Sequence, residues 1–188
     1  MKAKNKKIYT EREDDYSMLS LWPGEVRAEA EKICKEALDF SEKHKNDMYV
    51  FKDFSKILGE LRLSYKDVIQ LLPPFLKQYD EYYYYDKKVD NNLAFGVDYF
   101  CKIIIRTKEG FIINLNLAFD VGAKDNINLL IEFLMTLGRK YNLILIDMYL
   151  ARVVDLSDKK SVEKYISDRI NWLNEIQERI DSITKKEN

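Results

Sequence analysis

The sequence predicts an α+β protein, and three features of the residue pattern lead to this class. Residues 21–80 have mainly helical periodicity, residues 81–118 are rich in alternating apolar residues, and residues 159–184 carry a long apolar helical stripe. Apolar residues make up 46% of the 188 positions, enough for a sizeable core. We therefore expect a flexible tail over 1–20, a helical region over 21–80 and an α+β region over 81–188. The last two regions either share one core or fold separately.

The tail and the first helix follow from local composition. Residues 1–20 carry four lysines in their first seven positions and few core-forming side chains. Pro23 and Gly24 then open a helix that is expected to extend to about Lys45. Its apolar residues recur every three or four positions, which makes one buried stripe. His44, the single histidine of the chain, lies at the end of this stripe and is expected to pack, not to bind a ligand.

Residues 54–72 have the apolar spacing of two short helices joined by a tight turn. The positions expected to face inward are Ile57, Leu58, Leu61, Leu63, Val68, Leu71 and Leu72. Ser64 stands where the N-cap of the second helix belongs, and Asp67 follows three residues later. This layout resembles the winged helix-turn-helix superfamily, in which the second helix shows its outer side chains to the DNA major groove.

The strands are expected to begin after a further short helix at 74–79. Residues 81–87 and 93–106 flank a good turn at 89–92, and residues 111–118 form the third strand of an antiparallel meander. In the third strand, one face is expected to present Phe111, Ile113, Leu115 and Leu117.

Three more elements complete the predicted order βββαβα. A helix is expected at 126–140, followed by a strand at 143–154 that is apolar on both faces and therefore central in the sheet. The chain closes with a long helix at 159–184. Its apolar seam consists of Ile166, Ile170, Leu173, Ile176, Ile180 and Ile183. The near-heptad stripes at 26–44 and 166–183 suit helix packing either within the fold or across a homodimer.

The resemblance at 54–72 implies a non-catalytic regulator that binds DNA. Glutamine can pair with adenine, lysine can reach guanine or phosphate, and tyrosine can contact phosphate. The candidate nucleic-acid contacts are Lys56, Arg62, Tyr65, Lys66, Gln70, Lys87 and Lys88, the last two forming a wing contact. Residues 51–79 contain five basic and three acidic side chains, whereas the whole chain has a net charge of −1. Any basic footprint is therefore local.

Four consecutive tyrosines, Tyr82, Tyr83, Tyr84 and Tyr85, support a second function. Alternation along a strand sends two rings to each face, so at least two rings should lie near solvent. Tyrosine is favoured at protein interfaces because a large rigid ring carries a polar tip. Stacking on nucleobases and packing across an edge strand are the alternatives. The second hypothesis is thus a protein-interaction module, such as an antitoxin, immunity or host-modulating factor.

A third hypothesis is a metal-dependent nuclease, because the order βββαβα resembles ribonuclease H-like enzymes, which gather carboxylates around two metal ions. The candidate carboxylates are Asp86 or Asp98, Glu132 and Asp147. Asp147 interrupts an apolar strand and needs a partner, for which Arg106 and Arg152 are the candidates. No glycine-rich phosphate loop or GxSxG motif is present, so we expect no enzyme, no metal and no cofactor.

Cys34 and Cys101 lack metal-ligand spacing and are expected to be reduced thiols of a cytoplasmic protein. No apolar run of about 18 residues exists, so no membrane helix is expected. The start of the chain has no apolar stretch typical of a secretory signal. The expected partners are therefore DNA or a protein, and no membrane.

Overall fold

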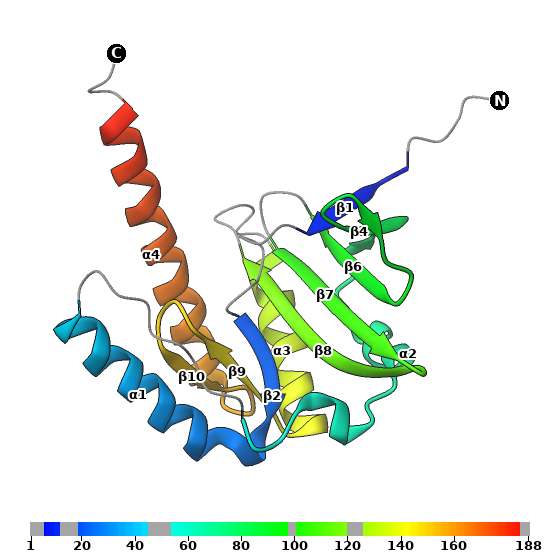
Figure 1. Ribbon diagram of the computed structural model, residues 1–188, viewed down its shortest axis with the longest axis horizontal. Coiled ribbons are helices and arrows are strands. Elements are labelled where there is room, and N and C mark those ends of the chain that lie inside the picture. Colours follow the sequence, from blue (N-terminus) through cyan, green and yellow to red (C-terminus); the bar gives the residue numbers. More distant parts are fainter. Residues whose placement is uncertain (1–5, 12–18, 45–53, 98–100, 120–125, 185–188) are drawn as a thin grey trace.

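The computed structural model describes residues 6–11, 19–44, 54–97, 101–119 and 126–184. Within these residues the chain is an α+β protein with one large and one small β-sheet (Figure 1). The α-helices are α1 (Arg27–Lys43), α2 (Tyr65–Ile69), α3 (Ile127–Tyr141) and α4 (Lys159–Thr184). Short 3-10 turns, η2 (Gly24–Val26) and η3 (Leu58–Leu61), precede α1 and α2.

The large sheet has seven strands in the order β10-β9-β2-β8-β7-β6-β3, and every neighbouring pair is antiparallel. In that order the strands are Arg152–Asp155, Leu143–Asp147, Leu19–Pro23, Phe111–Phe119, Cys101–Lys108, Asn92–Val97 and Lys77–Gln78. The predicted meander is therefore present, but β6, β7 and β8 form it.

The small sheet has the order β1-β4-β5. Its strands are β1 (Ile8–Glu11), β4 (Glu81–Tyr84) and β5 (Lys87–Lys88). β4 and β5 form an antiparallel hairpin, and β1 lies parallel to β4. The small sheet therefore joins two segments that are about 70 residues apart along the chain.

One face of the large sheet is covered by α3, α2, η3 and the first half of α4. Alternate strand residues enter this core, as Leu19 and Leu21 of β2 and Leu143 and Leu145 of β9 illustrate. The same cluster includes side chains from both halves of the chain, so residues before and after 80 share one core. At the edge of this layer, a Cβ on Gly138 would lie 2.3 Å from the backbone of Leu156, so α3 packs directly on that backbone.

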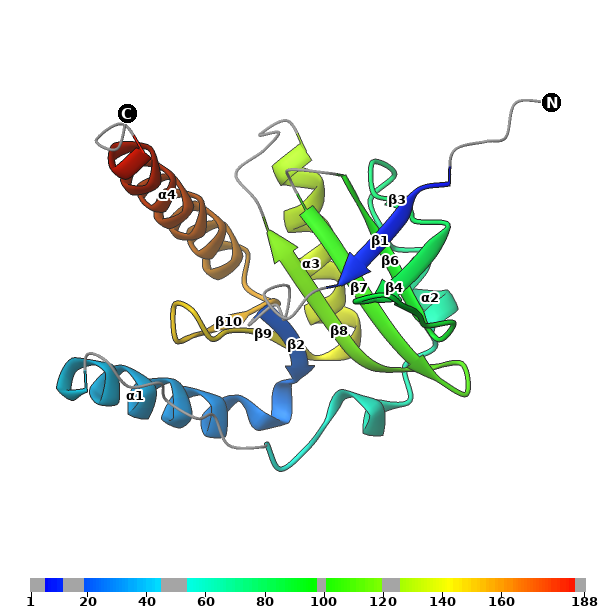
Figure 2. The ribbon, with the colours of Figure 1, turned by 45° about the horizontal axis from the view of Figure 1, so that its top comes forward.

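The opposite face of the large sheet is covered at its two ends by different elements. α1 packs Ala30 and Ile33 against Ile144 and Ile146 of β9. The small sheet lies over the other end, on Ala94 of β6 and Ile104 of β7. Figures 1 and 2 both show α1 and the small sheet as separate layers at the two ends of this face.

Several sequence predictions agree with these elements, and others need correction. The α+β class, the helix at 126–140 and the long C-terminal helix are confirmed. β9 is an internal strand, and all five of its residues are buried. The predicted strands at 93–106 and 143–154 are each a hairpin, so the order from β6 onward is βββαββα and not βββαβα. Apolar residues lie on both sides of Asp98 in the first run and of Asp147 in the second, and this pattern led to the prediction of one strand in each case.

Two segments expected to lack strands contain them. The expected tail 1–20 includes β1 and the start of β2, because Tyr9 and Leu19 are buried in two different apolar clusters. The short helix expected at 74–79 is absent, and residues 77–78 form β3, where the Tyr79 N–H donates to the Ala94 carbonyl at 2.9 Å. The strand 81–87 belongs to the small sheet as β4 and β5.

The third strand of the meander also differs from simple alternation. Arg106 pairs with Asn114 and Thr107 pairs with Ile112, so Ile113 is an extra residue in β8. This bulge turns Ile113 to the surface, where it is 43% exposed, although Leu115 is buried. The predicted apolar face therefore holds only beyond the bulge.

Candidate functional site

The predicted helix-turn-helix segment contains less helix than its spacing indicates. η3 has four residues of 3-10 geometry and α2 has five residues, little more than one α-helical turn. Arg62 joins the two with a left-handed backbone, at φ 49°. The segment therefore presents one short turn of helix at the position where a reading helix was expected.

Backbone hydrogen bonds attach this segment to the hairpin between β7 and β8. The Tyr65 N–H donates to the Gly110 carbonyl at 3.3 Å, and the Ile112 N–H donates to the Leu63 carbonyl at 2.8 Å. These bonds cross from the start of α2 to the strand beside it. α2 is thus part of the wall of the main core, not a separate unit.

Of the predicted contact residues in this segment, Tyr65 serves packing, whereas Lys66 and Gln70 face solvent. Tyr65 and Ile69 are half-buried and pack against the main core, while Val68 is fully buried. Lys66 and Gln70 are exposed. A surface for base contacts would therefore depend on these two side chains.

Carboxylates lie close to Tyr65. Its side chain lines a cavity of about 390 Å³ together with Asp90 and Glu109, both exposed. Negative charge next to a phosphate-contacting residue opposes the approach of a nucleic acid, whose backbone is anionic.

The predicted flanking lysine and arginine have partners of their own. Lys56 forms an ion pair with Glu25 at 3.0 Å. The Arg62 guanidinium lies over the Phe111 ring, 4.5 Å from its centroid, and Glu109 lines the same hollow. Both cations are thus engaged within the protein surface.

The four tyrosines occupy different environments. Tyr82 is only 3% exposed, and its ring centroid lies 5.3 Å from that of Tyr9 in the cluster beneath the small sheet. Tyr82 is therefore a core residue of the layer beneath the small sheet. Buried aromatic rings in contact contribute both area and a preferred geometry, so this pair fixes β1 against β4.

The other three tyrosines lie at or near the surface. Tyr83 and Tyr84 are half-buried, and Tyr85 is 42% exposed in the hairpin turn, where its φ is 54°. The Tyr83 hydroxyl donates to Glu81 at 3.2 Å, and the rings of Tyr84 and Tyr85 meet edge to face at 4.9 Å. The expectation that at least two rings lie near solvent is confirmed.

Tyr83 belongs to the surface of the small sheet that points away from the large sheet. The strand register sets Ile8 opposite Glu81, and Tyr83 between Thr10 and Lys88. Opposite residues share a face of a sheet, and the buried Tyr9 and Tyr82 form the other face. We call these five residues, Ile8, Thr10, Glu81, Tyr83 and Lys88, the outer face. Ile8, at its edge, is 50% exposed.

Glu81 organises the charges of the outer face. Lys6 and Lys88 both reach its carboxylate, at 2.7 Å and 3.3 Å. The hydrogen bond from Lys6 is the main cause that holds the pKa of Glu81 below its usual value. Lys88, proposed as a wing contact, is therefore paired with a carboxylate, while Lys87 is exposed.

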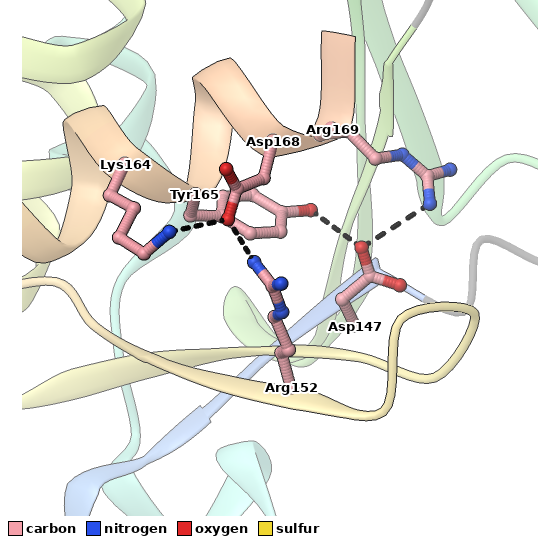
Figure 3. A network of polar contacts seen from close by, with 6 residues as sticks. All are labelled: Asp147, Arg152, Lys164, Tyr165, Asp168 and Arg169. Atoms are coloured by element: carbon pink, nitrogen blue, oxygen red, sulfur yellow. Dashed lines mark hydrogen bonds and ion pairs between the residues drawn. The ribbon is translucent and has the colours of Figure 1, made fainter. Parts of the chain in front are cut away.

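A second polar cluster lies inside the molecule, where α4 meets the end of β9 (Figure 3). Asp147 is fully buried and accepts hydrogen bonds from the Tyr165 hydroxyl at 3.0 Å and from Arg169 Nη1 at 3.3 Å. Its other carboxylate oxygen accepts the Leu150 N–H at 3.0 Å, which shapes the turn between β9 and β10. Burial raises the pKa of Tyr165 well above its usual value.

Arg169 is held on two sides. It is 5% exposed, and its guanidinium lies 4.4 Å from the Trp172 ring centroid and 5.3 Å from that of Tyr149. Its Nε makes no hydrogen bond within the part of the chain that the structure describes. The sequence signal for this residue was its position inside the apolar seam of α4, between Ile166 and Leu173.

The arginines expected to pair with Asp147 pair elsewhere. Arg106 binds Glu11 at 2.6 Å, and Arg152 binds Asp168, which also accepts Lys164 at 3.0 Å (Figure 3). The hydrogen bond from Arg152 is the main cause that lowers the pKa of Asp168. Glu11 is fully buried and lies in the segment expected to be a tail, so no sequence pattern pointed to this pair.

The carboxylates of the nuclease hypothesis lie on different elements. Glu132 is exposed on α3, Asp86 is exposed in the hairpin of the small sheet, and Asp147 is occupied as described above. Asp98 lies outside the described residues. Among the described residues, no group of three or more His, Cys, Asp or Glu side chains could hold a metal ion.

The two cysteines are buried, and the single histidine contacts an aromatic ring. Burial raises the pKa of Cys34 to about 11 and that of Cys101 still further, so both thiols are protonated at neutral pH. The His44 ring stacks on Phe40 at 4.5 Å, but His44 is exposed, so it does not extend the buried stripe of α1. Within the described ranges, no helix is long and apolar enough to span a bilayer.

Comparison of the chain with protein-family models, with curated proteins and with solved structures finds no match.

Proposed function

We propose that this protein is a non-catalytic binding module that docks a protein partner on the outer face of its small sheet. The observation that carries the proposal is the placement of Tyr83. Its ring stands on the outer face, in the row formed with Thr10 and Lys88, and its hydroxyl is oriented by Glu81. An amphipathic ring in this setting has the chemistry of an interface anchor.

The support beneath Tyr83 keeps it in place before a partner arrives. Tyr9 and Tyr82 form the buried face of the same two strands, and their rings contact each other. Ion pairs from Lys6 and Lys88 fix Glu81. A side chain held in its bound conformation loses little conformational entropy on association, so such a surface favours affinity.

Site-specific photocrosslinking tests this proposal even though the partner is unidentified. A benzophenone amino acid is placed at Tyr83 and, as a matched control, at Tyr149, which is 48% exposed in the turn after β9. Irradiation in cells that produce the protein should yield a discrete protein adduct from position 83 and none from position 149. No adduct from position 83, or the same adduct from both positions, would overturn the proposal.

DNA binding through α2 is the second candidate that we propose, because Lys66 on α2 and Gln70 directly after it are both exposed. A mobility shift against mixed-sequence DNA, at low and at moderate salt, tests it. Salt-sensitive binding that disappears in Lys66→Glu would support this candidate, since lost phosphate contacts weaken affinity steeply with ionic strength. Failure to bind at low salt would exclude it.

A further inference from the structure

β1 forms one edge of the small sheet (Figure 2), because β4 is its only strand neighbour among the residues that the structure describes. Two backbone hydrogen bonds show which of its residues face β4. The carbonyls of Lys7 and Glu11 accept N–H groups from the residues directly before and after β4, at 2.7 Å and 3.0 Å. Backbone groups alternate in direction along a strand, so the N–H and C=O groups of Ile8 and Thr10 point away from β4.

The surroundings of this edge are open. Ile8 is 50% exposed, and Thr10 is also exposed. The two lysines that precede β1 are turned toward other partners. Lys6 pairs with Glu81 at 2.7 Å, and Lys7 Nζ donates to a carbonyl of β6 at 3.2 Å. The edge therefore presents backbone donors and acceptors to solvent.

The other sheet edges carry features that hinder pairing with a further strand. β5, the second edge of the small sheet, consists of two exposed lysines. In the large sheet, β3 has only two residues, and β10 contacts both α1 and α4. Very short strands, lysines and covering helices are the means by which proteins block an exposed edge. β1 has four residues, and its outward side chains, Ile8 and Thr10, are β-branched and uncharged.

Contacts on the inner side of β1 fix the strand before a partner arrives. The Tyr9 ring centroid lies 5.3 Å from that of Tyr82, and the Glu11 carboxylate pairs with Arg106 at 2.6 Å. Tyr9 and Glu11 are at most 4% exposed. A strand that is already extended binds a further strand without the entropic cost of ordering itself.

Building on the proposed function, we propose that the partner of the outer face supplies an extended segment that pairs with β1 as a further strand of the small sheet. A sheet edge determines the kind of chain that covers it, because its alternating donors and acceptors match those of another extended backbone. Side chains of the added strand on the outer-face side stand beside Ile8 and Thr10. We therefore expect aliphatic or β-branched residues at these positions of the partner.

Two variants at one residue test the added strand, with the benzophenone amino acid at Tyr83 and irradiation in cells as above. Thr10→Pro and Thr10→Ala both remove the hydroxyl, but only proline removes the N–H that faces the open edge. Proline is tolerated where the N–H of an edge strand faces solvent, so both variants should keep the melting temperature of the unchanged chain. The adduct should persist in Thr10→Ala. It should fall at least about fivefold in Thr10→Pro, the size of one lost backbone hydrogen bond.

The attachment sites in the partner provide a second measurement, which needs no proline. The benzophenone amino acid is placed at Ile8 and, in a separate variant, at Thr10, and mass spectrometry identifies the partner residue that each one joins. Paired strands run side by side, so the two sites should lie within about four residues of each other in one segment. Attachment to separate segments, or to a second copy of this chain, would overturn the added strand, even if Thr10→Pro loosened β1.

The adduct yields separate this proposal from the proposed function. Equal yields from Thr10→Pro and Thr10→Ala would overturn the added strand. The adduct from position 83 still forms in that case, so docking on the outer face would stand. A chain that keeps Thr10 and yields no adduct from position 83 would instead overturn the proposed function, and the added strand with it.

Discussion

The buried pair of Asp147 and Arg169 permits a quantitative prediction about stability. Asp147→Asn leaves the Arg169 guanidinium buried at 5% exposure without its counter-charge. Arg169→Met leaves the carboxylate with only the Tyr165 and Leu150 donors. Removing one member of a buried ion pair typically costs about 3–5 kcal/mol, so each single variant should lose a free energy of unfolding in that range at pH 7.

The double variant separates the pair from its surroundings. The asparagine and the methionine that replace Asp147 and Arg169 carry no charge, and the methionine keeps a contact with the Trp172 ring that Arg169 now covers at 4.4 Å. The double variant should therefore be more stable than the sum of the two single losses predicts, by at least about 2 kcal/mol.

Urea unfolding followed by circular dichroism and tryptophan fluorescence measures all four proteins of this cycle. Trp172 reports directly, because it contacts Arg169. Losses that add within about 0.5 kcal/mol, or single losses below about 1 kcal/mol, would refute the view that this pair fastens α4 to the sheet.

Other contacts of the fold lead to three more predictions. The pKa of Tyr165 is raised, so the folded chain holds the phenol proton at pH values where the unfolded chain loses it. The free energy of unfolding should therefore fall as pH rises above about 10. Tyr165→Phe should make this alkaline decline smaller in urea titrations. The pKa values of Asp155 and Asp168 are lowered, so their contribution to the free energy of unfolding is present above about pH 4 and should be lost as pH falls below it. A midpoint of urea unfolding that stays unchanged down to about pH 2 would contradict this. Gly138→Ala should cost at least about 1–3 kcal/mol, because its Cβ would lie 2.3 Å from the Leu156 backbone, whereas an unchanged melting temperature would contradict that close approach.

Helices with a continuous stripe of apolar residues could be predicted from the sequence, whereas the connections between strands could not. The periodicity of 126–140 and 159–184 located α3 and α4 within one or two residues. The run 143–154 is apolar apart from Asp147 and Arg152, and the hairpin within it depends on the Asp147 carboxylate, which accepts the Leu150 N–H. A side chain that stabilises its own turn by a hydrogen bond does not change the hydrophobic periodicity of the sequence.

The small sheet shows a second limit of reasoning from sequence. Alternation correctly indicated that the tyrosine strand has two unlike faces, with Tyr82 buried and Tyr83 nearer the surface. The partner strand β1 lies in a segment whose lysines are typical of a mobile tail. Parallel pairing across some 70 residues is a tertiary contact, and no local pattern specifies it.

The partner of Asp147 was missed for the same reason. A carboxylate in an apolar strand correctly indicated a buried ion pair. Which arginine supplies the charge depends on how α4 docks on β9, and Arg169 reaches Asp147 only in the folded chain. An arginine inside an apolar helical seam is the feature that identifies such a residue.

The dissociation constant of the crosslinked partner for three purified variants decides whether Tyr83 anchors that partner. Tyr83→Ala should weaken binding at least about 30-fold, the size of a loss of about 2 kcal/mol at an interface anchor. Tyr83→Phe keeps the ring and should weaken binding far less. Leu129→Ala, at a 47% exposed position of α3 across the large sheet, should leave affinity unchanged. Equal affinities for Tyr83→Ala and Leu129→Ala would show that Tyr83 is not an interface anchor.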